Sequence, residues 1–262
     1  MEMDDIQKQM RRFFLTATLL LGVGLSLSRA QTLQASRVLM DTLTYGLNAS
    51  KEVVAILDTY GPELHDKMNK VVGYTTQTMS SYPPESPLSN MAANALLAIA
   101  KRHYGQDKVD FALTNFGGIR TSFPKGNVTL YYVYAAFPFE NTLVLVSLKG
   151  KEVRTLFEHF AQRRPEALAG IKLVIENNKI KELFINDQPL DDERTYQVAT
   201  IDFLLHGGDK MSVLAENLGV NYSGITIRDV ILEYISAFYE KGEPIPATLD
   251  GRVVVINNKD KS

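Results

Sequence analysis

The sequence predicts a mixed α+β fold, with helices and sheets layered in a single domain. Apolar residues recur at helical spacing in several separate stretches, and the stretches between them show period-two or β-branched strand patterns. The composition, with 45% hydrophobic and 22% charged residues, is that of a globular protein with one sizeable core. No internal repeat or low-complexity segment interrupts the alternation of strand and helix patterns.

The N-terminal segment has the pattern of a secretory signal. Arg11 and Arg12 precede an apolar run over residues 13–27, which is shorter than the roughly 20 residues that span a bilayer. Small residues at the end of this run suit cleavage after Ala30. We therefore expect residues 1–30 to be a signal peptide, and the mature protein to be periplasmic or on the cell surface, without stable membrane insertion.

Two alternatives remain open for this segment. An apolar run of this length can stay uncleaved and serve as a membrane anchor. Translation can also start at Met10, because the acidic stretch over residues 2–5 is unusual in front of a basic signal. Either alternative places the following domain outside the cytoplasmic membrane.

The remainder of the chain divides into a leader, a domain and a tail. Residues 31–59 form a helix-like leader of mixed polarity, and Tyr60-Gly61-Pro62 is a turn that separates it from the domain. The domain is expected to cover residues 60–257, which is within the usual size range of one domain. A polar tail follows at residues 258–262.

The first elements of the domain are a helix and a strand. Ser86 can cap a helix whose first residue is Pro87, and its apolar positions continue at helical spacing until Gly105. Residues 109–114 then alternate between apolar and polar, which predicts a strand with one buried face.

A second strand and helix follow. Residues 142–148 are β-branched and apolar, as in a strand, and Lys149-Gly150 is interpreted as a turn. The next helix is expected to bury a face formed by Val153, Leu156, Phe157 and Phe160.

The C-terminal part of the domain continues the alternation. Residues 171–176 and 180–185 flank Asn177-Asn178-Lys179 and so predict a hairpin, and residues 195–200 predict another strand. A last helix begins after the cap Thr226 and is stopped by Gly242, and residues 252–256 form a closing strand.

Charge and residue types exclude several function classes. The net charge of -2 gives no basic field for polymeric nucleic acid, and the absence of Cys removes thiolate chemistry and Cys-ligated zinc. The four histidines have no metal-ligand spacing, and no G-x-S-x-G, P-loop or G-x-G-x-x-G motif occurs. We therefore expect neither a catalytic residue nor a metal or other cofactor in this chain. The histidines are His65, His103, His159 and His206.

Two Gly-Gly loops are the candidate binding features. Gly117-Gly118 leads to Arg120, and Gly207-Gly208 leads to Asp209; each pair follows an expected strand. Glycine lets backbone N–H groups approach a ligand closely, although such pairs also serve as ordinary turns. Phe139 and Phe203 lie near these loops and can be either ligand-facing rings or core residues.

The strings NFGGIR, PFEN and YQVATIDFLLHGGDKM closely resemble, in order and spacing, the C-terminal domain of the 5′-nucleotidase and UDP-sugar hydrolase family. The resemblance extends from about residue 60 to residue 256 and includes LSNMAANALLAIA as the first helix of the domain.

The resemblance implies a site for a nucleoside or nucleoside monophosphate. It places the base between Phe139 and Phe203, and the ribose hydroxyls on Asp209. Arg120 is expected near the ribose and phosphates, and the asparagines at further polar positions. The predicted substrate-binding residues are Asn115, Gly117, Gly118, Arg120, Phe139, Asn141, Phe203, Gly207, Gly208 and Asp209.

Two departures from the family pattern bear on function. The family carries a further Arg shortly before the first helix of the domain, whereas residues 81–85 are Ser-Tyr-Pro-Pro-Glu, which predicts a weaker hold on phosphate. The family also places a metallophosphoesterase domain with two metal ions ahead of this one, and residues 31–60 are too short to be that domain.

We therefore expect the nucleotide-recognition half of a 5′-nucleotidase, a hydrolase of nucleotide catabolism. It would work with a separate metallophosphoesterase chain that carries the divalent metal ions. A non-catalytic extracytoplasmic nucleoside-binding module is the alternative, and a degenerate structural domain is a third possibility.

Overall fold

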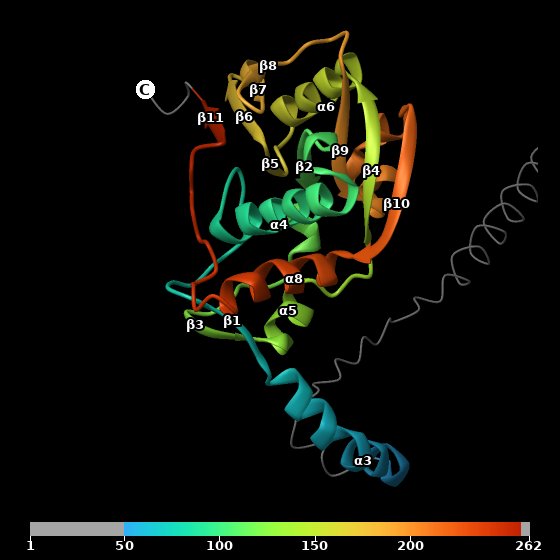
Figure 1. The fold of residues 1–262 in the computed structure, drawn as a ribbon, viewed down its shortest axis with the longest axis vertical. Coiled ribbons are helices and arrows are strands. Elements are labelled where there is room, and N and C mark those ends of the chain that lie inside the picture. The colour runs from blue at the N-terminus through green and yellow to red at the C-terminus, as the bar shows by residue number, and fades with distance from the viewer. Residues whose placement is uncertain (1–49, 258–262) are drawn as a thin grey trace, which may run out of the picture. The chain divides into compact units, whose positions relative to one another are not determined.

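The structure, a computed structural model, describes residues 50–257 (Figure 1). The predicted signal peptide, the leader up to residue 49 and the tail over residues 258–262 lie outside the described residues. Within the described part of the chain, no helix combines the length and the apolar character needed to cross a membrane.

Helix α3 (Lys51–Met68) contains the point, between Ile56 and Leu57, where the chain divides into two compact units. None of its residues is buried. The helix runs through residues 60–62, so the prediction of a turn there is wrong. Pro62 removes one N–H donor from an exposed helix, and that loss does not end it.

A five-stranded sheet organises the second unit, and its strand order is β10-β4-β9-β2-β5. Strands β9 and β2 are parallel, and the other neighbouring pairs are antiparallel. The predicted alternation in β2 is wrong, because all four of its residues are buried. Helix α4 contacts β2 and β5, and a ring of α6 contacts a ring of β2. The strands are β2 (Phe111–Thr114), β4 (Thr142–Lys149), β5 (Ala167–Ala169), β9 (Thr195–Ile201) and β10 (Gly219–Thr226).

Helix α4 (Pro87–Tyr104) begins and ends where the sequence predicts. The Ser86 hydroxyl accepts the N–H of Ser89, and Gly105 follows the last turn. Helix α8 (Ile227–Tyr239) likewise begins after Thr226, whose hydroxyl accepts the N–H of Asp229. Capping residues therefore predict both helix starts correctly.

Helix α6 (Gly150–Gln162) starts directly after β4, so the predicted turn at Lys149-Gly150 is wrong. A Cβ at Gly150 would lie 2.0 Å from the carbonyl oxygen of Asp191. The glycine is therefore explained by a close backbone approach and not by a turn. The four predicted apolar positions of this helix are all buried.

Two smaller sheets complete the unit. One has the order β11-β6-β7-β8, and the predicted hairpin within it turns at Asn177 and Asn178, with φ values of 50° and 61°. The other pairs β1 with β3. Neither β1, β3 nor the short helices α5 and α7 were predicted. The elements are β1 (Val71–Thr75), β3 (Gly126–Thr129), α5 (Leu130–Ala136), β6 (Ile171–Glu176), β7 (Lys179–Ile185), β8 (Gln188–Pro189), α7 (Asp202–Leu205) and β11 (Val253–Ile256).

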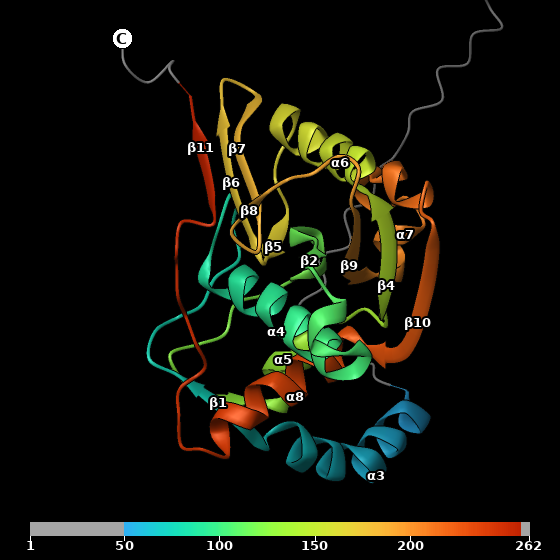
Figure 2. The same cartoon turned by 45° about the horizontal axis from the view of Figure 1, so that its top comes forward.

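The sheet topology brings several connecting segments to one edge (Figure 2). Because β2 and β9 are parallel, both end at the same edge of the sheet. Strand β4 is antiparallel to β9, with Leu143 opposite Ile201, so β4 begins there. Strand β5 also begins there, since Thr114 pairs with Ala167. The α+β class is confirmed, and this edge carries the candidate site.

Candidate nucleotide site

The first Gly-Gly loop leaves strand β2 at Asn115, which is buried. Residues 116–118 form one 3₁₀ turn, and the backbone there is outside the left-handed region. A Cβ at Gly118 would lie 2.7 Å from Asn115 Oδ1, and one at Gly117 would lie 3.3 Å from Nδ2. The glycines therefore make room for the Asn115 side chain.

The segment between α5 and β4 carries the first predicted ring. Phe137 is buried, whereas Phe139 is 45% exposed. Asn141 is half-buried, and its carbonyl accepts the N–H of Ile227 at 2.8 Å. Together with Asn115 and Gly118, Phe139 and Asn141 line a small cavity of about 10 Å³. That space holds about one water and no base, so a base would have to lie against the exposed face of the ring.

The second ring, Phe203, follows strand β9 and is 43% exposed. Asp202 fixes its position, since its carboxylate accepts the N–H of Phe203 at 2.7 Å and the Thr142 hydroxyl at 2.7 Å. Thr142 is the first residue of β4, so this contact links the two ring-bearing segments. Both predicted rings are thus partly exposed on segments that flank the ends of neighbouring strands.

The second Gly-Gly loop packs against Phe203. A Cβ at Gly208 would lie 2.4 Å from the Phe203 ring and 2.5 Å from its carbonyl oxygen. The backbone is left-handed at Gly207, Asp209 and Lys210, with φ values of 87°, 51° and 65°. This turn presents the Asp209 carboxylate to the first loop.

A side-chain hydrogen bond joins the two loops. Asn115 Nδ2 donates to Asp209 Oδ2, although the residues are 94 positions apart in the sequence. Asn115 Oδ1 is buried and has no hydrogen-bond partner among the described residues. A buried unpaired acceptor costs about 1–3 kcal/mol, so a ligand N–H or O–H donor at this atom would be favourable.

Arg120 lies beside the first loop. Its side chain is exposed and donates to the Gly117 carbonyl at 3.4 Å. Its backbone N–H donates to Ala136 at 2.9 Å, which ties the loop to the end of α5. The guanidinium therefore stays at the outer side of the loop, with donors available to a ligand.

Glu166, just before β5, is a supporting residue that the sequence did not reveal. Its Oε2 accepts the N–H of Phe116 at 2.7 Å, and its Oε1 accepts from Arg164 at 3.0 Å. Burial raises the pKa of this carboxyl group, and the hydrogen bonds from Phe116 and Arg164 oppose that rise. Glu166 therefore anchors the first Gly-Gly loop from a segment 50 residues away.

The described residues show where each predicted side chain lies. Asn115, Gly118, Phe139 and Asn141 share one cavity, and Asp209 is bonded to Asn115. Phe203 and Gly208 are in contact on the adjoining loop. Within residues 50–257, no group of three or more His, Asp or Glu side chains is arranged to hold a metal ion.

The comparisons with known proteins identify the class of this chain. The model of the family "5′-nucleotidase, C-terminal domain" matches residues 71–216, which is more than half of the chain. Protein UshA of Salmonella pullorum is 32% identical over 147 residues, covering 51% of this chain and 27% of that protein. The chain therefore belongs to the 5′-nucleotidase C-terminal domain family.

Two further relatives extend the match. The trifunctional nucleotide phosphoesterase protein YfkN of Bacillus subtilis (strain 168) is 30% identical over 218 residues, covering 75% of this chain and 14% of that protein. The crystal structure of a 5′-nucleotidase precursor from Thermus thermophilus has a TM-score of 0.68 and 26% identity, covering 78% of this chain and 43% of that one. The chain spans at most about a quarter of these curated relatives.

Proposed function

We propose that this chain binds the nucleoside part of a nucleotide and is the recognition half of a 5′-nucleotidase. The observation that carries the proposal is the pair of partly exposed rings, Phe139 and Phe203, on adjacent segments of one sheet edge. Single exposed apolar side chains are common on protein surfaces, so it is the pairing of two exposed rings beside polar groups at one end of the sheet that indicates a ligand. A flat base gains about 1–3 kcal/mol by stacking on such a ring and tolerates changes of base.

Polar groups beside the rings suit the sugar and the base edge. The Asp209 carboxylate can accept hydrogen bonds from ribose hydroxyls while it holds Asn115. The unpaired Asn115 Oδ1 would gain a donor from the nucleoside. Arg120, exposed at the outer side of the first loop, would contact the phosphate.

The hydrolytic step requires groups that we assign to a separate chain. In this proposal a metallophosphoesterase partner holds divalent metal ions, which activate water and polarise the phosphate oxygens. This chain orients the nucleotide, because the bound base fixes where the phosphate projects. The predicted signal peptide would place this chain in the periplasm or on the cell surface, so the partner would have to act there as well.

A titration of the partner tests this proposal. We expect that adding the chain to a metallophosphoesterase from the same source raises hydrolysis of a nucleoside monophosphate relative to p-nitrophenyl phosphate, since only the nucleotide has a base to bind. F139A and R120A should each reduce the gain. K108Q, which removes an exposed charge outside the site, serves as the matched control.

The same titration discriminates the alternative. The missing basic residue over residues 81–85 favours a non-catalytic nucleoside-binding module, because such a module needs no phosphate contact. If the chain binds a nucleoside but the nucleotide preference of the partner does not rise, the binding-module function is the correct one. If F139A and R120A raise the preference as much as the wild-type chain does, nucleoside recognition at this site is contradicted.

A further inference from the structure

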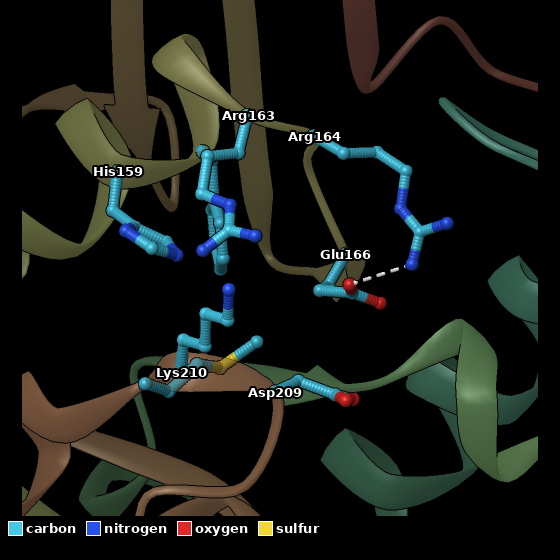
Figure 3. Close-up of a pocket in the computed structure, with 8 residues that line it drawn as sticks. His159, Arg163, Arg164, Glu166, Asp209 and Lys210 are labelled. Atoms are coloured by element: carbon cyan, nitrogen blue, oxygen red, sulfur yellow. Dashed lines mark hydrogen bonds and ion pairs between the residues drawn. The ribbon is translucent and has the colours of Figure 1, made fainter. Parts of the chain in front are cut away.

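A second pocket, of about 430 Å³, adjoins the candidate nucleotide site (Figure 3). The end of α6, the segment before β5 and the loop after α7 form its walls. The titratable side chains that line it are His159, Arg163, Arg164, Glu166, Asp209 and Lys210. None of these except Asp209 belongs to the predicted site.

Charge is unevenly distributed in this pocket. On one side, Arg164 is paired with Glu166 at 3.0 Å, and Asp209 is bonded to Asn115. On the other side, Arg163 and Lys210 form no ion pair with any described residue. Figure 3 shows the guanidinium of Arg163 and the amino group of Lys210 pointing toward each other, with His159 beside them.

The charges of Arg163 and Lys210 both act on the imidazole of His159. The pKa of His159 is lowered, first by burial and then by the charges of Arg163 and Lys210. All three side chains line the same pocket, and Figure 3 shows both cations near the imidazole. Two like charges that converge repel each other, and an anion placed between them removes that cost.

We propose that Arg163 and Lys210 form a second anion subsite, which takes a phosphate group. A guanidinium offers a planar pair of donors to phosphate oxygens, and an ammonium adds a compact charge with three donors. Arg163 follows α6 directly and its backbone N–H donates to His159 at 3.1 Å, so its main chain is fixed. The neutral imidazole of His159 can supply one further N–H donor.

The position of this subsite indicates the class of ligand, and this step rests on the proposed function. Asp209 lines the cationic pocket and, through Asn115, borders the cavity beside Phe139. A ribose that donates one of its two hydroxyls to Asp209 would leave its other hydroxyl oxygen, 2′ or 3′, at the border of the pocket. The ligand class is therefore a nucleotide with a second phosphate on the 2′ or 3′ oxygen.

Calorimetry with pyrophosphate, at low ionic strength, tests the subsite without a nucleoside. The wild-type chain should bind pyrophosphate, and the R163Q/K210Q variant should bind it at least tenfold more weakly. The K108Q/K241Q variant removes the same charge from exposed positions outside the pocket and should bind like wild type. Equal binding by R163Q/K210Q and wild type, or no binding by wild type, would overturn the subsite.

Calorimetry with adenosine 5′-monophosphate and adenosine 3′,5′-bisphosphate tests the ligand class. The bisphosphate should bind wild type at least tenfold more tightly than the monophosphate, and the ratio should fall to about one in R163Q/K210Q. Equal affinities in wild type overturn the ribose-side placement. If pyrophosphate binding depends on Arg163 and Lys210 but neither nucleotide binds, the subsite stands and the proposed function fails.

Discussion

The two Gly-Gly loops differ in the reason for their glycines. At Gly118 the backbone is ordinary, and the Asn115 amide occupies the space that a side chain would need. The second loop is left-handed at Gly207, and at Gly208 the ring and carbonyl of Phe203 leave no space for a Cβ. A side chain at position 118 could be accommodated if the Asn115 side chain moved. A side chain at position 208 would require the backbone at Phe203 to move as well.

In both loops a glycine makes room for a residue of the candidate site. Gly118 accommodates Asn115, and Gly208 accommodates Phe203. The sequence interpretation, that these glycines bring backbone N–H groups close to a ligand, stays a prediction. The comparison indicates that substitutions should damage the second loop more than the first.

The largest effect is expected for G208A. A methyl group there would contact the Phe203 ring and carbonyl oxygen, so the free energy of unfolding should fall by about 1–3 kcal/mol. Adenosine binding should also weaken, because the ring moves. Urea denaturation and calorimetry measure the two effects.

G207A is the matched control for this change. Its Cβ meets nothing within 4 Å, but its left-handed φ of 87° should cost about 1–2 kcal/mol. Stability should therefore fall in both variants, while adenosine affinity falls mainly in G208A. An equal loss of affinity in both would contradict the packing role of Gly208.

Glu166, which anchors the first Gly-Gly loop, should show the next largest effect on stability when it is substituted. E166A leaves the buried N–H of Phe116 without its acceptor, which should cost about 1–3 kcal/mol of unfolding free energy. E166Q retains an acceptor oxygen and should cost less. Urea denaturation compares the two variants, and an equal cost would show that the hydrogen bond to Phe116 does not stabilise the loop.

The pH dependence of E166Q should reveal the state of this carboxyl group. Burial raises the folded-state pKa of Glu166 above its ordinary value of 4.5, so folding favours the protonated form. Its contribution to stability is full below pH 4.5 and is lost as the pH rises through the raised pKa. The stability of wild type relative to E166Q should therefore fall as the pH rises from about 4 to about 8. A rise over this range would mean a lowered pKa.

The smallest effects on stability are expected for the glycines of the first loop, beginning with G118A. The new methyl group pushes the Asn115 amide, whose Oδ1 lies 2.7 Å from the position that the Cβ would take, and should cost about 1 kcal/mol. The Asn115–Asp209 hydrogen bond should weaken, which lowers adenosine affinity. G117A, with its nearest contact at 3.3 Å, should have less effect. A larger loss in G117A would contradict the assignment.

Features that depend on local patterns were predictable from the sequence. Ser86 and Thr226 mark helix starts, and the Asn177-Asn178 turn marks the hairpin. Strand β10 was missed because all of its residues are exposed or half-buried and the strand has no buried face to give an alternation. Helix α5 was missed because it has only 7 residues.

In the candidate site, too, the residues that belong to a motif were predictable, and the residues that meet only through the fold were not. The resemblance supplied Phe139, Phe203 and Asp209, and these residues lie at one edge of the sheet. Glu166 could not be found, because its partner Phe116 is 50 positions away and no motif connects them. The cationic pocket was missed for the same reason, since Arg163 and Lys210 meet only through the fold.

The central claim, that Phe139 and Phe203 hold a nucleoside base, is tested most directly by calorimetry with adenosine. F139A and F203A should each weaken binding by about fivefold to 150-fold, equivalent to about 1–3 kcal/mol. Y222A, which removes another exposed ring (61% exposed) from β10, should leave the affinity unchanged. Unchanged affinity in both phenylalanine variants, or equal weakening by Y222A, would contradict the account.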